Sequence, residues 1–181
     1  MLPVLTLMRL CGSAFAVAVL GIAIAPLAAA APVNYDALPV DPNVITDSTA
    51  YIAEAPQSNP AGQPGVEQVF THRDGSRAIT DTVWVLADPQ AAAGALQAAR
   101  SRLGTILTEQ SSEAAPVGEN GTLVSGPSPD GSQWVGVLQF TRGNTAVQAA
   151  FDSARNDPVP TDLVVEYGQR QDQVIRQLLG Q

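Results

Sequence analysis

Several side chains are scarce in this 181-residue chain, which has no lysine, one histidine, one cysteine and only 5% aromatic residues. Its nine cations, all arginine, face 17 acids, and the formal net charge is −8. Binding to nucleic-acid phosphates requires clustered cations, and docking on anionic lipid surfaces requires a basic segment. The sequence therefore predicts no nucleic-acid partner and disfavours peripheral docking on anionic lipid.

The first thirty residues have the pattern of an export signal. Arg9 is the only charged residue before Asp36, and residues 11–24 are all apolar or small. The run ends in small residues that suit signal peptidase, so we expect cleavage between Ala30 and Ala31 and a secreted or periplasmic protein of the cell envelope. The alternative is an uncleaved membrane anchor over residues 10–31, a stretch long enough to span a bilayer.

The scarcity of cysteine and histidine also limits the available chemistry. A lipobox places its cysteine after the apolar region, at the cleavage point, whereas Cys11 precedes that region. Removal of the signal with Cys11 leaves a mature chain without disulfides or thiolate ligands. A zinc site needs several Cys or His ligands, and the sequence contains no twelve-residue calcium loop. Residues 118–121 are not followed by the Lys-Ser or Lys-Thr of a phosphate-binding loop. We predict no metal and no cofactor.

The mature chain divides into a Pro-rich segment and a regular domain. Residues 31–65 carry six prolines with little periodicity, which predicts an extended N-terminal arm. Residues 43–55 remain open between a short helix and a docking loop. From residue 66 onward the pattern is regular, and we expect a single domain over residues 66–181.

Strands and helices of that domain follow from alternation and from turn signals. Asp-Gly pairs separate the expected strands 66–73 and 77–87, and also 122–126 and 133–142; a further strand is expected over 145–151. Asp88 and Pro89 predict the start of a helix that runs to residues 107–108, and a last helix begins at Thr161 or Asp162. The order ββαβββα, with short turns, predicts an α+β fold: an antiparallel sheet of about five strands and two packed helices.

Four runs of sequence resemble small exported proteins of mycobacteria whose function is not established: residues 65–77 (GVEQVFTHRDGSR), 86–89 (LADP), 121–126 (GTLVSG) and 157–160 (DPVP). The expected element order is also similar to that of PsbP-like envelope proteins, such as the lipoprotein LpqN, and of PknH-type extracellular sensor domains. These resemblances imply binding or sensing in the envelope rather than catalysis. The chain lacks the lipobox of LpqN and the paired cysteines of PknH, so no residue role is carried over.

Two constellations are candidates for a functional site. His72, with Asp74 and Ser76, has the residue types of a hydrolytic triad, but all three lie at one hairpin tip without a nucleophile elbow. We therefore favour an exposed turn. Four aromatic residues are the candidates for a ligand pocket that could hold a lipid or another amphiphile, although aromatic residues at this spacing also fill cores: Trp84, Trp134, Phe140 and Tyr167. We expect Trp134 to be well buried.

The function that the sequence favours is a secreted, non-catalytic binding or sensor-like module of the bacterial cell envelope, whose partner is a lipid, a glycolipid or an envelope protein. One alternative is a secreted hydrolase that uses His72. Another is a structural or antigenic envelope protein without a small ligand. The sequence leaves the oligomeric state open.

Overall fold

The computed structural model describes residues 34–46 and 48–181. The expected signal segment and its cleavage point at Ala30 and Ala31 lie outside these residues. The described residues belong to one compact unit, Val33–Gln181. No helix in the described part of the chain is long and apolar enough to cross a membrane.

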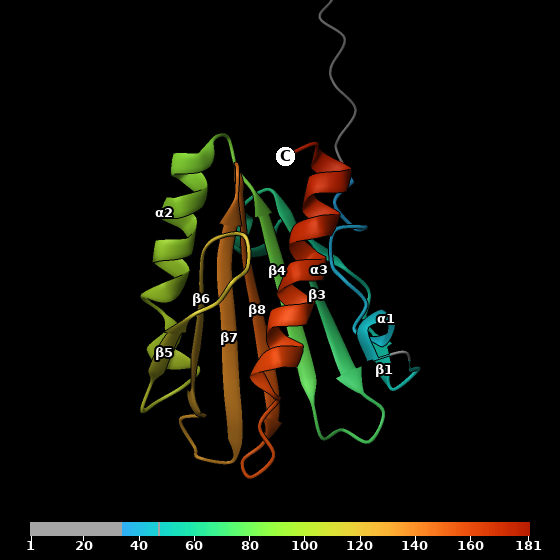
Figure 1. The fold of residues 1–181 in the computed structure, drawn as a ribbon, viewed down its shortest axis with the longest axis vertical. Helices are drawn as coiled ribbons and strands as arrows, with labels where there is room; N and C mark the ends of the chain where they lie inside the picture. The colour runs from blue at the N-terminus through green and yellow to red at the C-terminus, as the bar shows by residue number, and fades with distance from the viewer. Residues whose placement is uncertain (1–33, 47) are drawn as a thin grey trace, which may run out of the picture. The chain divides into compact units, whose positions relative to one another are not determined.

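An antiparallel sheet of eight strands forms the centre of the fold (Figure 1). Its long strands are β3 (Gly65–His72), β4 (Ala78–Val85), β6 (Glu119–Pro127), β7 (Gln133–Arg142) and β8 (Thr145–Ala154), and its short strands are β1 (Tyr51–Ala53), β2 (Gln57–Ser58) and β5 (Ser111–Ala114). The order is β1-β3-β4-β8-β7-β6-β5, and β2 also pairs with β3. The predicted α+β class is confirmed. The sheet has eight strands rather than about five, because three short segments without clear alternation pair with the long strands.

The turns between long strands lie where the Asp-Gly and Gly-Asn signals predict them. In the β3–β4 hairpin Phe70 is paired with Ile79, and Gly75 in the turn has a φ of 73°. Gly143, between β7 and β8, has a φ of 49°. Glycine adopts such left-handed conformations without steric cost, so these turns are specified locally.

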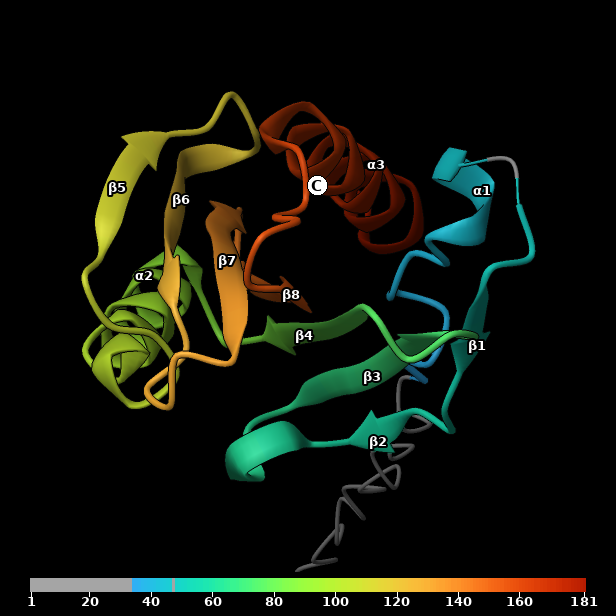
Figure 2. The same cartoon turned by 90° about the horizontal axis from the view of Figure 1, so that it is seen from below.

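Helices cover both faces of the sheet (Figure 2). On one face, Ala92 and Leu96 of α2 (Pro89–Arg100) pack with Ala146 of β8. On the other face, Tyr167 of α3 (Thr161–Leu179) packs with Phe151 of the same strand. Successive residues of a strand point to opposite faces, which is why even and odd positions of β8 contact different helices.

The start of α2 follows the prediction and its end does not. Asp88 caps the helix, since its carboxylate accepts a hydrogen bond from the backbone N–H of Ala91 at 2.8 Å. The helix ends at Arg100 rather than near residue 107, and a separate turn of 3-10 helix, η2 (Leu103–Thr105), follows. Gly104 lies in that turn, and glycine disfavours a continued α-helix. Leu103 and Leu107 are nevertheless buried, as the apolar pattern predicts.

The Pro-rich segment packs against the α3 side of the sheet. It contains α1 (Asn43–Thr46), β1, β2 and η1 (Pro60–Gly62). Leu38 and Val40 are buried in the main core. Residues 43–55, left open by the sequence, thus contain both a short helix and an edge strand.

Candidate functional site

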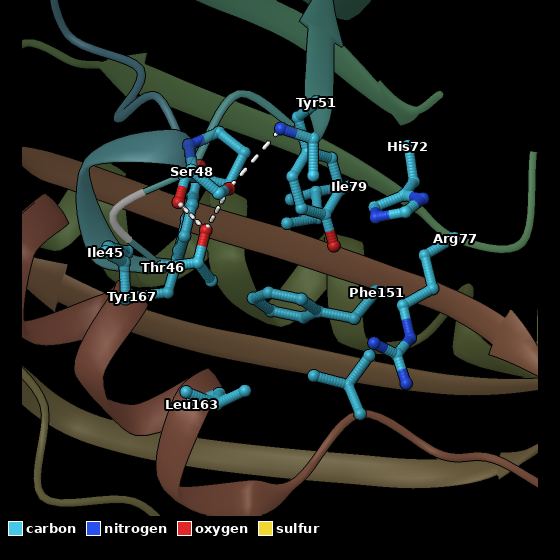
Figure 3. A pocket seen from close by; sticks show the side chains of 13 residues that line it. Ile45, Thr46, Ser48, Tyr51, His72, Arg77, Ile79, Phe151, Leu163 and Tyr167 are labelled. Atoms are coloured by element: carbon cyan, nitrogen blue, oxygen red, sulfur yellow. Dashed lines mark hydrogen bonds between the residues drawn. The ribbon is translucent and has the colours of Figure 1, made fainter. Parts of the chain in front are cut away.

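A pocket opens on the α3 side of the sheet, between the Pro-rich segment and the end of the β3–β4 hairpin (Figure 3). Its volume is about 260 Å³. Thirteen residues from five parts of the chain line it: Pro42, Ile45, Thr46, Ser48, Ala50, Tyr51, His72, Arg77, Ile79, Phe151, Val159, Leu163 and Tyr167. Ligand sites in proteins usually begin at about 300 Å³, so this pocket suits a small ligand.

The floor and one side of the pocket are apolar. Ile79 of β4 and Phe151 of β8 are paired across the sheet and buried on its α3 face. The ring of Tyr167 meets that of Phe151 edge to face, with centroids 5.4 Å apart. Leu163, on the first turn of α3, lies at the opposite side from His72 and Arg77 (Figure 3). This part of the pocket is built to hold hydrocarbon.

The other side of the pocket is polar. His72, Arg77 and Tyr51 gather there, and the hydroxyl of Tyr51 points into the pocket (Figure 3). The rings of Tyr51 and His72 meet edge to face at 5.2 Å. Burial raises the pKa of the Tyr51 hydroxyl, and the nearby Arg77 charge partly opposes this rise. Tyr51 therefore remains a neutral hydrogen-bonding group at neutral pH.

His72, Asp74 and Ser76 come together, but not as a triad. The Nδ1 atom of His72 lies 2.5 Å from Asp74 Oδ1, and the Ser76 hydroxyl donates to the same oxygen at 2.6 Å. In a hydrolytic triad the serine contacts the histidine, whereas here both contact the acid. The two hydrogen bonds from Ser76 and that from His72 hold the pKa of Asp74 well below its usual range. The arrangement is that of a hydrogen-bonded turn.

His72 nevertheless contributes to the pocket wall, since only 26% of its side chain is exposed. Replacing His72 with Ala is expected to destabilise the protein by about 0.5–1.5 kcal/mol, because the edge-to-face pair with Tyr51 is lost. That is more than we expect for a fully exposed turn residue. Urea denaturation measures the change, and His72→Phe is the control that keeps the aromatic pair. Equal losses in the two variants would contradict a packing role.

A set of buried, hydrogen-bonded polar groups lies behind the pocket. The Tyr167 hydroxyl lies 2.9 Å from Asp81 Oδ2 and 3.0 Å from the backbone oxygen of Val40. Asp81 is fully buried, and its Oδ1 atom has no hydrogen-bond partner among the described residues. Burial raises the pKa of Asp81 to about 7, although the hydrogen bond from the Tyr167 hydroxyl opposes the rise.

Two side chains of α3 hold the Pro-rich segment in place. Besides the Tyr167 hydroxyl, Gln171 accepts a hydrogen bond from the Val40 N–H at 3.0 Å and donates to the Leu38 carbonyl at 2.8 Å. All four residues are buried. Since residues 42–46 and 48–50 contribute one wall of the pocket, these buried contacts determine where that wall lies.

The structure does not bring the four predicted aromatic residues together. Phe140 and Tyr167 are buried in the core on the α3 side, and Tyr167 alone of the four lines the pocket. Trp84 packs beside α2 on the opposite face of the sheet. Alternation separates the two faces within one strand, but it could not relate the faces of β4 to those of β7.

Trp134 lies on the α3 side, apart from the pocket, and the expectation that it is well buried is wrong. It is only partly buried, with Arg155 above its ring at 5.8 Å, and it borders a separate hollow of about 290 Å³ beside residues 158–161. The reason is its place at the start of β7, next to the 128–132 turn, where α3 does not cover the sheet.

Three residues of the site, Asp81, Arg77 and Tyr51, were not identified as site residues from the sequence. Asp81 lies between Ile79 and Val83 at a spacing of two, so alternation places it on the buried face. Arg77 is the first residue after the hairpin turn, and Tyr51 lies in the Pro-rich segment. No local pattern indicates that these last two side chains meet.

Comparison with solved structures finds a similar fold in the extracellular domain of PknH from Mycobacterium tuberculosis, with a TM-score of 0.56 and 9% sequence identity over 81% of this chain and 98% of that one. No family model and no curated protein matches the sequence. The fold-level resemblance to PknH-type domains is thus supported. The comparisons give no support to the resemblance to exported mycobacterial proteins or to PsbP-like proteins.

Proposed function

We propose that this protein is a non-catalytic, extracellular binding module of the bacterial cell envelope, and that the pocket beside Ile79, Phe151 and Leu163 is its ligand site. The observation that carries the proposal is the composition of this pocket, which has apolar walls and the polar side chains of Tyr51, His72 and Arg77 at one side. Concave sites of this type bind small organic ligands.

Two further observations support an extracellular role. The N-terminal sequence has the pattern of an export signal, and the fold is similar to a domain described as extracellular. The geometry of His72, Asp74 and Ser76 favours binding over hydrolysis, since the serine hydroxyl donates to the acid rather than to the histidine. Fold similarity alone is weak evidence for function, so the proposal rests mainly on the pocket.

The size of the pocket limits the ligand. A water molecule occupies about 30 Å³ of liquid, so a pocket of about 260 Å³ holds roughly nine groups of that size. A short alkyl chain with a polar head has about this bulk. Octan-1-ol is therefore a suitable neutral probe for a site expected to receive part of a lipid or glycolipid.

Replacing Leu163 with Trp is expected to weaken octan-1-ol binding at least about fivefold, because the larger side chain enters the pocket. Leu163 is 37% exposed, so the change should leave folding intact. Calorimetric titration measures the affinity. In the unchanged protein, a concentration ten times the Kd should add about 1.4 kcal/mol to the free energy of unfolding.

The matched control is Leu178→Trp, near the far end of the same helix, where the leucine is 55% exposed and does not line the pocket. It should bind octan-1-ol as the unchanged protein does. Equal affinity in all three proteins would place the binding site elsewhere, and absence of saturable binding to the unchanged protein would contradict the proposed function.

A further inference from the structure

Arg77 lies on the polar side of the pocket, and its side chain is 29% exposed. Its Nη2 atom pairs with Asp157 Oδ2 at 2.7 Å. Its Nε atom is buried and has no hydrogen-bond partner among residues 34–46 and 48–181. Because Nε is closed off, a ligand in the pocket would meet the exposed part of the Arg77 side chain rather than this atom.

Arg77 is the one permanently charged side chain among the described residues that line the pocket. Among the described residues that line the pocket, none is Asp or Glu, and Arg77 is permanently charged. Asp81, the nearest acid in the core, lies behind Tyr167, to whose hydroxyl it is hydrogen-bonded. The described lining therefore carries one permanent positive charge and no acid, although the whole chain carries −8.

Asp157 neutralises Arg77 only from outside. Its side chain is 69% exposed, against 29% for Arg77. An exposed ion pair is screened by water and salt and contributes little. An anion inside the pocket meets less water, so its attraction to the same guanidinium is stronger.

We infer that the ligand of this pocket is a small single-chain amphiphile with an anionic head, which binds the guanidinium of Arg77 while the alkyl chain lies on Ile79, Phe151 and Leu163. This inference rests on the proposed function and names the class of ligand. Tyr51 supplies a second, neutral hydrogen-bonding group beside the head, because its hydroxyl points into the same space (Figure 3).

The test compares three probes of equal chain length at pH 7.5: octanoate, octan-1-ol and octylamine. We expect octanoate to bind the full chain at least about tenfold more tightly than octan-1-ol, and octylamine to bind most weakly. Octyl phosphate in place of octanoate distinguishes a phosphate head from a carboxylate head. Acetate alone should bind at least a hundredfold more weakly than octanoate, since it lacks the chain.

Variants then assign the preference to Arg77. Arg77→Met should reduce the affinity for octanoate to that for octan-1-ol, and Arg77→Lys, which keeps a charge without the planar guanidinium, should retain part of the preference. Asp157→Asn should tighten octanoate binding about two- to fivefold and leave octan-1-ol unchanged. The control Arg170→Met removes an equal charge from the exposed face of α3 and should change neither affinity.

The outcomes separate the two proposals. If octanoate and octan-1-ol bind the unchanged protein equally, the preference for an anionic head is contradicted, while the proposed binding pocket is still supported. If neither probe binds, the proposed function itself fails. If Arg77→Met does not fold, Asp157→Asn still decides the matter, because unchanged octanoate affinity in that variant would contradict a role for the Arg77 charge.

Discussion

Replacing Asp81 with Asn is expected to make the protein more stable than the unchanged protein at pH 8, and less stable by about 1–3 kcal/mol at pH 4, where only the unpaired amide donor distinguishes the two. In the folded protein the pKa of Asp81 is raised from 3.8 to about 7 by burial. The folded state therefore holds the proton more tightly than the unfolded chain does. Stability from this group is fully present below pH 4 and is lost as the pH rises towards 7.

The size of the effect follows from the same shift. At 1.36 kcal/mol per pKa unit, the rise corresponds to a loss of the order of 4 kcal/mol between pH 4 and pH 8. The Asn side chain never ionises, so the variant escapes this loss. Its amide introduces a buried donor, which offsets about 1–3 kcal/mol of the gain.

Urea denaturation of both proteins between pH 4 and pH 8 measures this difference. Other carboxylates titrate equally in both proteins and cancel in the comparison. Asp152→Asn is the control, since burial also raises the pKa of Asp152, which is less deeply buried, and the change should be smaller with the same sign. If the unchanged protein and the Asp81→Asn variant differ in stability by the same amount at every pH, that result contradicts a raised pKa of Asp81 in the folded protein.

Replacing Gln171 with Leu is expected to cost about 2–5 kcal/mol of stability. The variant leaves the Val40 N–H and the Leu38 carbonyl buried without their partner, and each unsatisfied group costs about 1–3 kcal/mol. Because the Pro-rich segment then loses two of its contacts with α3, the pocket wall formed by residues 42–46 and 48–50 should also loosen. Octan-1-ol affinity should fall together with stability.

The matched control is Gln177→Leu on an exposed position of the same helix, which should change stability by less than about 0.5 kcal/mol. Thermal unfolding and calorimetry give the two readouts. A Gln171→Leu variant as stable as this control would mean that the segment is held by apolar contacts of Leu38 and Val40 alone.

The elements predicted well are those specified by neighbouring residues. The Asp74-Gly75 turn, the Asp88 cap of α2 and the alternation of β7 depend on short-range geometry, and the structure contains all three. The order of the five long strands and two long helices followed from them. The short strands β1, β2 and β5 were missed because they are held by pairing with long strands rather than by a pattern of their own.

The pocket could not be predicted because its residues meet only in the folded chain. Tyr51 comes from the Pro-rich segment, Arg77 from a hairpin and Phe151 from β8, and no spacing in the sequence relates them. The predicted aromatic site failed to assemble for a related reason. Nothing in the sequence states that α2 and α3 cover opposite faces, so Trp84 and Trp134 could not be separated.

The most direct test of the binding pocket is a titration of octan-1-ol followed by the methyl signals of isoleucine. The described residues contain two isoleucines in the pocket, Ile45 and Ile79, and three outside it, Ile52, Ile106 and Ile175. We expect the signals of Ile45 and Ile79 to shift and saturate together, while those of the other three stay in place. Shifts of equal size at all five positions, or none at any, would contradict it.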